Sequence, residues 1–356
     1  MGAEEAGVLA ITLADLRHRY RQFLIAVVGA GLVFALALLL TGMVNGFRNE
    51  VDRTVDSAEA NGWVVTEGVS GPFTSVHAID ESVVSELTAT TGVTDASGLV
   101  ISLQTVDSGS ALERAMVIGA PEDGPGPVTP PVGEPVRGDD EAVVDRRLDL
   151  DTGDQFTLGT RTFTVVGLME GMTMLGGTPD VWISLDAAQD VLFQGQPLVT
   201  TIVVQGTPDA LPSGMVLMSD EDVEEDSLGP MADAVASVDN SRYMMWVVAA
   251  VIVAALIYVS ALQRLRDFAV LKAVGASSMS LFVGVALQAV LITLAAAALA
   301  AASAGLLKPL YLVPVEVPAQ AYVVLPVLAV GIGVLSSLVA LRQALKVDPA
   351  LAFGGG

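Results

Sequence analysis

The sequence contains no cysteine among its 356 residues and only two histidines, His18 and His77. Without cysteine the chain can form neither a disulfide framework nor a thiolate zinc site. Two histidines far apart in the sequence leave a histidine metal cluster or a Ser-His-Asp site without its parts. The chain also lacks a GxxxxGK[ST] phosphate loop and the glycine run of dinucleotide-binding proteins. We therefore expect no metal site, no bound cofactor, no catalytic residues and no enzyme activity in this chain.

Basic residues are also scarce. The 17 Lys and Arg stand against 40 Asp and Glu, which gives a formal net charge of −23. Such a field repels nucleic acid, which we exclude as a partner, and it keeps an exposed domain soluble. The densest acidic run, residues 219–226, lacks the glycine and the alternating spacing of an EF-hand loop. We interpret it as solvated surface rather than as a calcium site.

Charged residues are missing altogether from four long stretches, and this absence is informative. Each stretch is long enough to cross a hydrocarbon core of ~30 Å as a helix, the form that satisfies its own backbone hydrogen bonds in lipid. The first is too long for the apolar core of a signal peptide, and no small-residue cleavage pattern follows it. We predict transmembrane helices at residues 23–44, 243–263, 279–307 and 321–341.

The positions of Lys and Arg beside these spans predict their orientation. Basic residues cluster before the first span, between the second and third, and after the fourth. Both termini are therefore predicted to be cytoplasmic in a multi-pass protein of the plasma membrane. The cytoplasmic segments hold 8 basic and 5 acidic residues, which leaves 9 basic and 35 acidic residues outside. The predicted segments are an amphipathic helix at 1–22, an outer domain at 45–242, a cytoplasmic loop at 264–278, a short outer loop at 308–320 and a cytoplasmic tail at 342–356.

The outer domain carries the patterns of a mixed α/β fold. Strand-like runs occur at 61–67, 99–106, 181–185 and 199–205, and helix-like runs occur at 80–90 and 186–193, the latter with Asp186 as a candidate cap. Two more strands are expected around Gly159-Thr160, and a Pro- and Gly-rich loop at 119–140. The predicted fold class is an α-helical membrane protein with four transmembrane helices plus a mixed α/β extracytoplasmic domain.

The charged segment between the second and third spans is the most distinctive motif. It reads RLRDFAVLKAVGASS at residues 264–278, and it resembles the cytoplasmic loop of FtsX-like, MacB-type ABC transporter permeases. In that family an Arg-Glu pair precedes an apolar-Leu-Lys-Ala-apolar-Gly-Ala-Ser run, and here Asp267 stands where Glu is usual. The segments GDQFTLGTRTFTVVGLME and LRQALKVDPALAF also resemble the family. The chain is thus similar to its short, four-span members along its whole length.

This resemblance implies a permease subunit driven by a separate ABC ATPase, which binds ATP and Mg²⁺, and a second copy of the permease in the same lipid membrane. It also implies the residues that contact the ATPase, because a helix in the loop would leave charges available to a partner. The predicted coupling residues are Arg264, Arg266, Asp267, Lys272 and Gly275.

The substrate is open at this point. The short form is similar to haem exporters among others, so export of a hydrophobic or amphiphilic substrate, with haem as one candidate, is the first hypothesis. Met43, Met244 and Met245 lie at the outer ends of spans one and two, and thioethers line adaptable apolar surfaces, so we take them as candidate cleft residues. The alternative is an FtsX-type protein that transports nothing and relays force to an extracytoplasmic partner such as a cell-wall hydrolase.

Overall fold

The computed structural model describes residues 20–263, 278–311 and 313–346, and it divides into two compact units. Unit 2 is Gly46–Val235, and unit 1 consists of the described residues before and after it. Both boundaries fall inside helices, namely α2 (Tyr20–Asp56) and α6 (Ala232–Gln263). Each unit therefore contains part of both helices.

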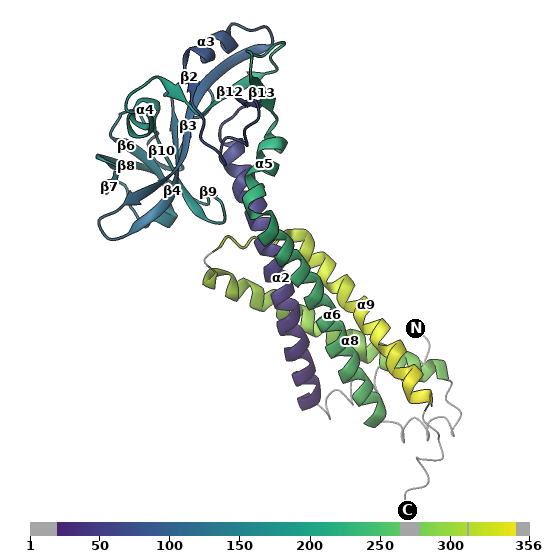
Figure 1. Ribbon diagram of the computed structural model, residues 1–356. Helices are drawn as coiled ribbons and strands as arrows, with labels where there is room; N and C mark the ends of the chain where they lie inside the picture. Colours follow the sequence, from purple (N-terminus) through teal and green to yellow (C-terminus); the bar gives the residue numbers. More distant parts are fainter. Residues whose placement is uncertain (1–19, 264–277, 312, 347–356) are drawn as a thin grey trace, which may run out of the picture. The chain divides into compact units, whose positions relative to one another are not determined.

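Unit 1 is a bundle of long apolar helices (Figure 1). Its members are α2, α6, α8 (Ser278–Leu307) and α9 (Ala319–Lys346), with the short 3-10 helix η3 (Lys308–Leu310) between the last two. Four helices of the described chain are long and apolar enough to cross a membrane, one for each predicted span. The helical part of the predicted fold class is confirmed.

Small residues let α8 and α9 approach each other closely. A Cβ atom added to Gly333 of α9 would lie 3.1 Å from backbone atoms of Ala289 and Val290 of α8. On α8, Ala296, Ala297, Ala300 and Ala304 are buried in the bundle, whereas Ala295, Ala298 and Ala302 of the same stretch are exposed. Close backbone approach is how helices associate in lipid, where the hydrophobic effect does not drive them together. The buried alanines are therefore used within one chain.

Helix α2 continues past residue 44, where the predicted span ends. Its last part is amphipathic, and Val51 and Val55, one helical turn apart, are buried in the core of unit 2. This packing keeps the segment helical although it contains charged residues.

Unit 2 is a mixed α/β domain. Its helices are α3 (Ser82–Thr88), η1 (Arg146–Leu148), α4 (Leu185–Phe193), α5 (Asp220–Leu228) and η2 (Gly229–Met231). Its strands are β1 (Gly62–Thr66), β2 (Ile79–Asp80), β3 (Val93–Asp107), β4 (Leu112–Ala120), β5 (Val132–Gly133), β6 (Glu141–Asp145), β7 (Gln155–Leu158), β8 (Arg161–Met169), β9 (Thr173–Met174), β10 (Thr178–Ser184), β11 (Leu198–Val199), β12 (Thr201–Gly206) and β13 (Met215–Met218).

The main sheet has the order β13-β1-β12-β3-β4-β10-β6-β8-β5, with β7 and β9 attached to its side and β11 paired with β2 in a separate ribbon. The pairs β4–β10 and β6–β8 are parallel, and the others are antiparallel. The long strand β3 joins the two halves, because it pairs with β12 as far as Leu99 and with β4 from Val100 onward. The β7–β8 hairpin forms where the sequence predicts it.

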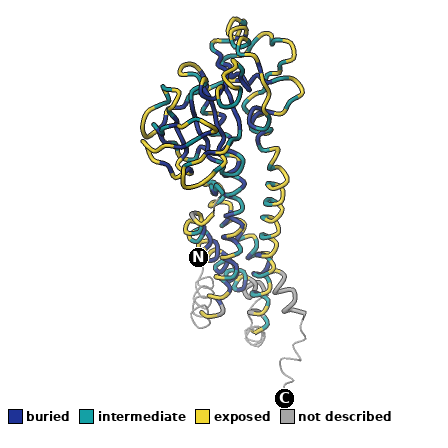
Figure 2. Tube along the Cα trace, turned by 60° about the vertical axis from the view of Figure 1, so that its left-hand side comes forward, coloured by how far each residue is buried: buried dark blue, intermediate teal, exposed yellow. Residues whose placement is uncertain are grey.

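Both faces of the sheet are covered at its centre, which explains why β6, β10 and β12 are almost continuously buried. Successive side chains of a strand point to opposite faces of the sheet, so alternate residues of the central strands lie in two different cores. Figure 2 shows the buried residues concentrated in these strands. One core contains Val100 and Val181 with Leu87 of α3 and Ala188 of α4, and the other contains Leu99 and Trp182 with Val55 of α2 and Val223 of α5.

Two local predictions need correction. The cap of α4 is Ser184, whose extended backbone lets its Oγ accept a hydrogen bond from the N–H of Ala187 at 3.1 Å, and Asp186 lies inside the first turn. Strand β3 begins at Val93 rather than at residue 99, because its polar first half pairs with β12. The acidic run at 219–226 forms α5, with a capping box between Ser219 and Asp222.

Candidate functional site

A groove of about 280 Å³ lies in unit 1 between α2, α6 and the start of α9. It is found at the ends of α2 and α6 that are closest in sequence to unit 2. Leu38 and Thr41 of α2 and Tyr243 and Trp246 of α6 form two of its walls. The third wall comes from α9 and includes Val324, Leu325 and Leu328.

Gly42 of α2 positions the third wall. The N–H of Glu316 donates a hydrogen bond to the carbonyl of Gly42 at 2.8 Å. A Cβ atom at Gly42 would lie 2.8 Å from Val317 and 2.9 Å from Val315, so only glycine allows this approach without a shift. The contact holds the segment before α9 against α2, and it thereby fixes where α9 begins.

Aromatic and charged side chains of α6 form the polar end of the groove. Trp246 packs on Phe34 of α2 with ring centroids 5.6 Å apart. Arg242 forms an ion pair with Asp239 at 2.8 Å, and its guanidinium lies 5.1 Å from the ring centroid of Tyr243. A groove with apolar walls and one cationic end can accept an amphiphile along its length.

The predicted methionines lie beside this groove and do not line it. Met43 is partly buried against the core of the bundle, Met245 is half-buried, and Met244 is 59% exposed. Their role in a cleft stays a prediction. The lining residues are neighbours of these methionines on α2 and α6, while the α9 wall depends on a contact that no local sequence pattern shows. In unit 2, Met172 and Met174 are buried in the core beside Val55 and Trp182.

The predicted coupling residues Arg264, Arg266, Asp267, Lys272 and Gly275 lie outside the described residues, in the segment 264–277. The same holds for the predicted amphipathic helix up to residue 19 and for the tail from residue 347. These assignments stay predictions.

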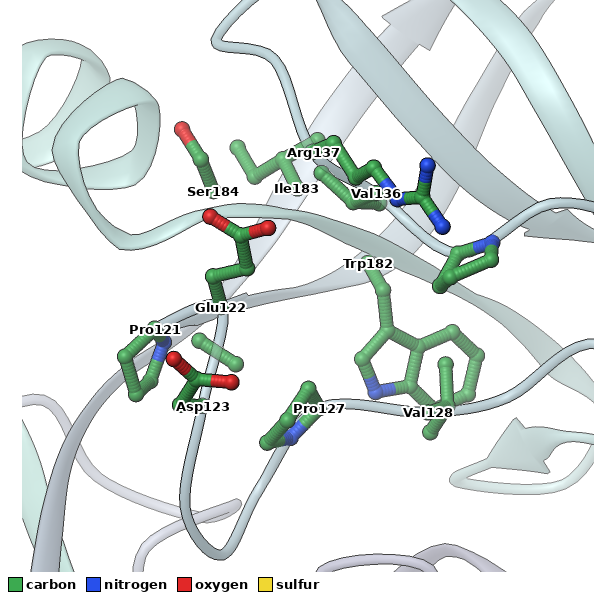
Figure 3. A pocket seen from close by; sticks show the side chains of 12 residues that line it. Pro121, Glu122, Asp123, Pro127, Val128, Val136, Arg137, Trp182, Ile183 and Ser184 are labelled. Atoms are coloured by element: carbon green, nitrogen blue, oxygen red, sulfur yellow. The ribbon is translucent and has the colours of Figure 1, made fainter.

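A second cavity, of about 240 Å³, lies in unit 2 (Figure 3). Trp182 of β10 contributes its indole ring, and the segment after β4 contributes Pro121, Pro127 and Val128. The charged side chains of Glu122 and Arg137 stand at its edge. The sequence predicts only a loop at 119–140, and it does not predict this cavity. The strand residue Trp182 was the available signal, because an aromatic ring of that size needs neighbours from outside its own strand.

The end of α2 is joined to the sheet of unit 2 by buried polar contacts. Oγ1 of Thr54 donates to Oδ2 of Asp180 at 2.7 Å, and Oγ1 of Thr173 donates to Oε2 of Glu50 at 2.9 Å. The N–H of Gly176 donates to the other oxygen of Glu50 at 2.5 Å. Glu50 and Thr54 are one helical turn apart and alternate with the buried Val51 and Val55. This spacing is the sequence signal for a docking face that the prediction missed.

Burial raises the pKa of carboxyl groups that the sheet contributes to this joint. Burial raises the pKa of Asp180 well above its usual range; the hydrogen bond from Thr54 opposes this shift, and the nearby carboxyl groups of Asp145 and Glu50 add to it. Burial also raises the pKa of Asp145, against hydrogen bonds from the backbone of Arg147 and Met172. Among the described residues, Oδ1 of Asp180 has no hydrogen-bond partner. The described residues contain no group of three or more His, Asp or Glu side chains that could hold a metal ion.

Comparison with known proteins identifies both parts of the chain. Residues 23–215 match the family model of the MacB-like periplasmic core domain, and residues 243–349 match that of the FtsX-like permease C-terminal. Two ABC transporter permeases of Mycobacterium tuberculosis H37Rv are 38% and 36% identical to the chain, and each match covers 98% of this chain and 100% of the relative. A permease of Mycobacterium bovis is likewise 38% identical over the same lengths.

Two solved structures align with the chain at low identity. The periplasmic region of MacB from Actinobacillus actinomycetemcomitans is 11% identical with a TM-score of 0.33, and the alignment covers 46% of this chain and 91% of that one. The extracellular domain of the noncanonic ABC-type transporter YknZ from Gram-positive bacteria is 10% identical with a TM-score of 0.34, and the alignment covers 45% of this chain and 100% of that one. On the family matches and the near full-length relatives, the chain belongs to the FtsX-like, MacB-type family of ABC transporter permeases.

Proposed function

We propose that this permease exports a hydrophobic or amphiphilic substrate from the membrane, driven by ATP hydrolysis on a separate subunit. The groove between α2, α6 and α9 is the observation that supports export, because its walls are apolar and one end is polar. A substrate that leaves lipid for such a groove keeps its apolar part out of water. Haem, an apolar ring that carries carboxylates, is one substrate of this kind.

The proposed contact with the ATPase is the segment 264–277, through Arg266 and Asp267. The sequence has no phosphate loop of its own, so in this proposal ATP and Mg²⁺ bind to the partner. Two permease copies with two ATPases complete the transporter. Helix α6 exposes Val247 and Val251 within unit 1, a face that is available to the second copy or to lipid.

The coupling can be tested on the purified complex of the permease with its ATPase. Replacing Arg266 and Asp267 together by Ala should reduce ATPase association or stimulation, while the permease still folds, because these charges are predicted to face a partner. The matched control is Arg114→Ala with Glu86→Ala, which removes one exposed cation and one exposed anion from unit 2. Full association and activity of the Arg266/Asp267 variant would show that the ATPase binds elsewhere.

Force relay without transport is the second candidate, and the joint at the end of α2 favours it. Because Glu50 and Thr54 are bonded to the sheet of unit 2, a movement of this part of α2 would be passed to the sheet. A bulky residue in the groove separates the two functions. Val324→Trp should block export and spare a relay, whereas Thr54→Val should impair a relay and leave entry to the groove unchanged. Both variants are compared with the wild type for their ability to protect cells from the exported substrate. If Val324→Trp protects cells as well as the wild type does, the relay is favoured.

A further inference from the structure

The groove of unit 1 has an unusual charge for this chain. Arg242 lines it, and neither Asp nor Glu is among its lining residues. The whole chain has 40 acidic and 17 basic residues, so a lining with a cation and no acid runs against the composition. The groove is therefore suited to an anionic rather than a cationic group.

The start of α9 adds a second positive feature to the same groove. Pro318, Gln320 and Ala321 line it, and α9 begins at Ala319. The first N–H groups of a helix lack intrahelical acceptors and form the positive end of the helix dipole. The first turn of α9 contains no acidic residue, and the proline before it offers no side-chain acceptor. The N–H of Ala321 donates to the carbonyl of Pro318 at 2.9 Å, so the backbone donors left for a ligand at this end are the N–H groups of Ala319 and Gln320.

The side chain of Arg242 is held in place beside these donors. Its Nη2 atom contacts Oδ1 of Asp239 at 2.8 Å and donates to the hydroxyl of Tyr243 at 3.4 Å. Asp239 balances part of the guanidinium charge, so the site suits one anionic group rather than several. An Arg guanidinium donates in a planar fork that matches phosphate oxygens, and helix N-termini also bind phosphate.

Apolar walls extend from this polar end. Leu38 of α2 and Val324 and Leu328 of α9 line the groove, together with the ring of Trp246. Such walls can hold an acyl chain whose head group lies at Arg242. We propose that the groove binds a membrane amphiphile whose head group carries one phosphate and no other charge, on Arg242 and the first turn of α9, with its acyl chain along Leu38, Val324 and Leu328. This assignment rests on the proposed function, for which it names the substrate class.

A native fluorophore makes the test direct. Of the three tryptophans of the chain, Trp63 and Trp182 are buried in unit 2, and Trp246 lines the groove. The full chain is reconstituted in phosphatidylcholine vesicles that contain increasing amounts of a phospholipid brominated on its acyl chains, as phosphatidylglycerol or as phosphatidylcholine. Bromine quenches a tryptophan that it contacts. We expect brominated phosphatidylglycerol to quench at about a tenfold lower mole fraction, since both lipids carry the phosphate and only phosphatidylcholine adds a cation, which the guanidinium and the helix N-terminus repel.

The variant Arg242→Gln should reduce this preference to about twofold or less, because the remaining selectivity then comes from the helix dipole alone. Lys308→Gln is the matched control: it removes one basic residue from the same unit, at η3, and Lys308 does not line the groove. It should keep the full preference. An equal preference in Arg242→Gln and the wild type would overturn the assignment, because it would reflect anionic lipid around the protein rather than in the groove. No preference in the wild type would overturn it as well.

Two further outcomes separate this inference from the proposed function. Lipid selectivity that is intact while the ATPase is never stimulated would contradict the export proposal alone. Export and ATPase stimulation without head-group selectivity would contradict the head-group assignment alone. If a Val324→Cys variant forms a disulfide-linked dimer and the wild type shows no lipid selectivity, the groove is occupied by a second copy of the chain instead.

Discussion

Asp180 is a carboxyl group buried completely inside unit 2, with Thr54 of α2 as its hydrogen-bonding partner. Because burial raises its pKa, the folded protein holds this proton more tightly than the unfolded chain does, where the usual value is 3.8. The resulting stabilisation is complete below the unfolded pKa and is lost as the pH rises through the raised folded pKa.

Asp180→Asn tests this linkage, since Asn keeps the shape and cannot ionise. We expect the thermal midpoint of the full chain in detergent to fall with rising pH above about pH 4 in the wild type, and to fall less in the variant. Glu86→Gln, an exposed residue of α3, is the control and should follow the wild type. Parallel pH profiles for Asp180→Asn and the wild type would mean that Asp180 is not protonated in the folded state.

Thr54→Val removes the hydroxyl that donates to Asp180 and keeps the side-chain shape. The buried carboxyl group then loses its partner, which should lower the free energy of unfolding by about 1–3 kcal/mol. Thr54→Ser keeps the hydroxyl and should lose less. Chemical denaturation of the full chain measures both, and equal losses for Val and Ser would assign the effect to packing instead.

At the scale of elements, glycines decide how closely the helices of unit 1 approach. Gly42→Ala would place a Cβ against Val317 and Val315, whereas Gly29, on the same helix, has no such neighbour within 4 Å. Gly42→Ala should destabilise the protein by about 1–3 kcal/mol through overpacking. Gly29→Ala should be neutral, or stabilising by up to about 1 kcal/mol, because alanine favours the helix. Thermal unfolding in detergent compares the stability of the two variants. Equal effects would show that Gly42 does not determine the position of α9.

The elements that the sequence predicts correctly are those set by local pattern. The spans follow from runs without charge, and the β7–β8 hairpin follows from alternation around Gly159. The features that the sequence does not predict depend on contacts between residues far apart in the chain. The first half of β3 is polar and becomes a strand because β12 pairs with it, and the groove needs Leu38 and Val324, which are far apart in the chain. Ser184 caps α4 because of its backbone angles, which composition does not reveal.

At the scale of the whole molecule, the predicted topology divides the charge unevenly across the membrane. Because the chain contains no cysteine, a thiol reagent labels only a cysteine that is introduced, so the topology can be tested directly. Single cysteines at Ser110, which is exposed in unit 2, and at Ser277, in the predicted cytoplasmic loop, should react differently with an impermeant thiol reagent on intact cells. We expect labelling at position 110 only. Labelling at 277 and not at 110 would reverse the topology.

The tight contact between α8 and α9 determines which wall of the groove can move. Gly333 lies against the backbone of α8, and separating the two helices would expose Thr293 and Ser337, which are fully buried. Helix α6 contributes Ala249, Val253 and Ile257 to the bundle core, and a smaller share of its span is buried than of the other three candidate spans. The residues that follow α6 begin the predicted ATPase-binding segment. If the ATPase binds that segment as proposed, we expect α6 to be the wall of the groove that moves, because α9 is held closely against α8.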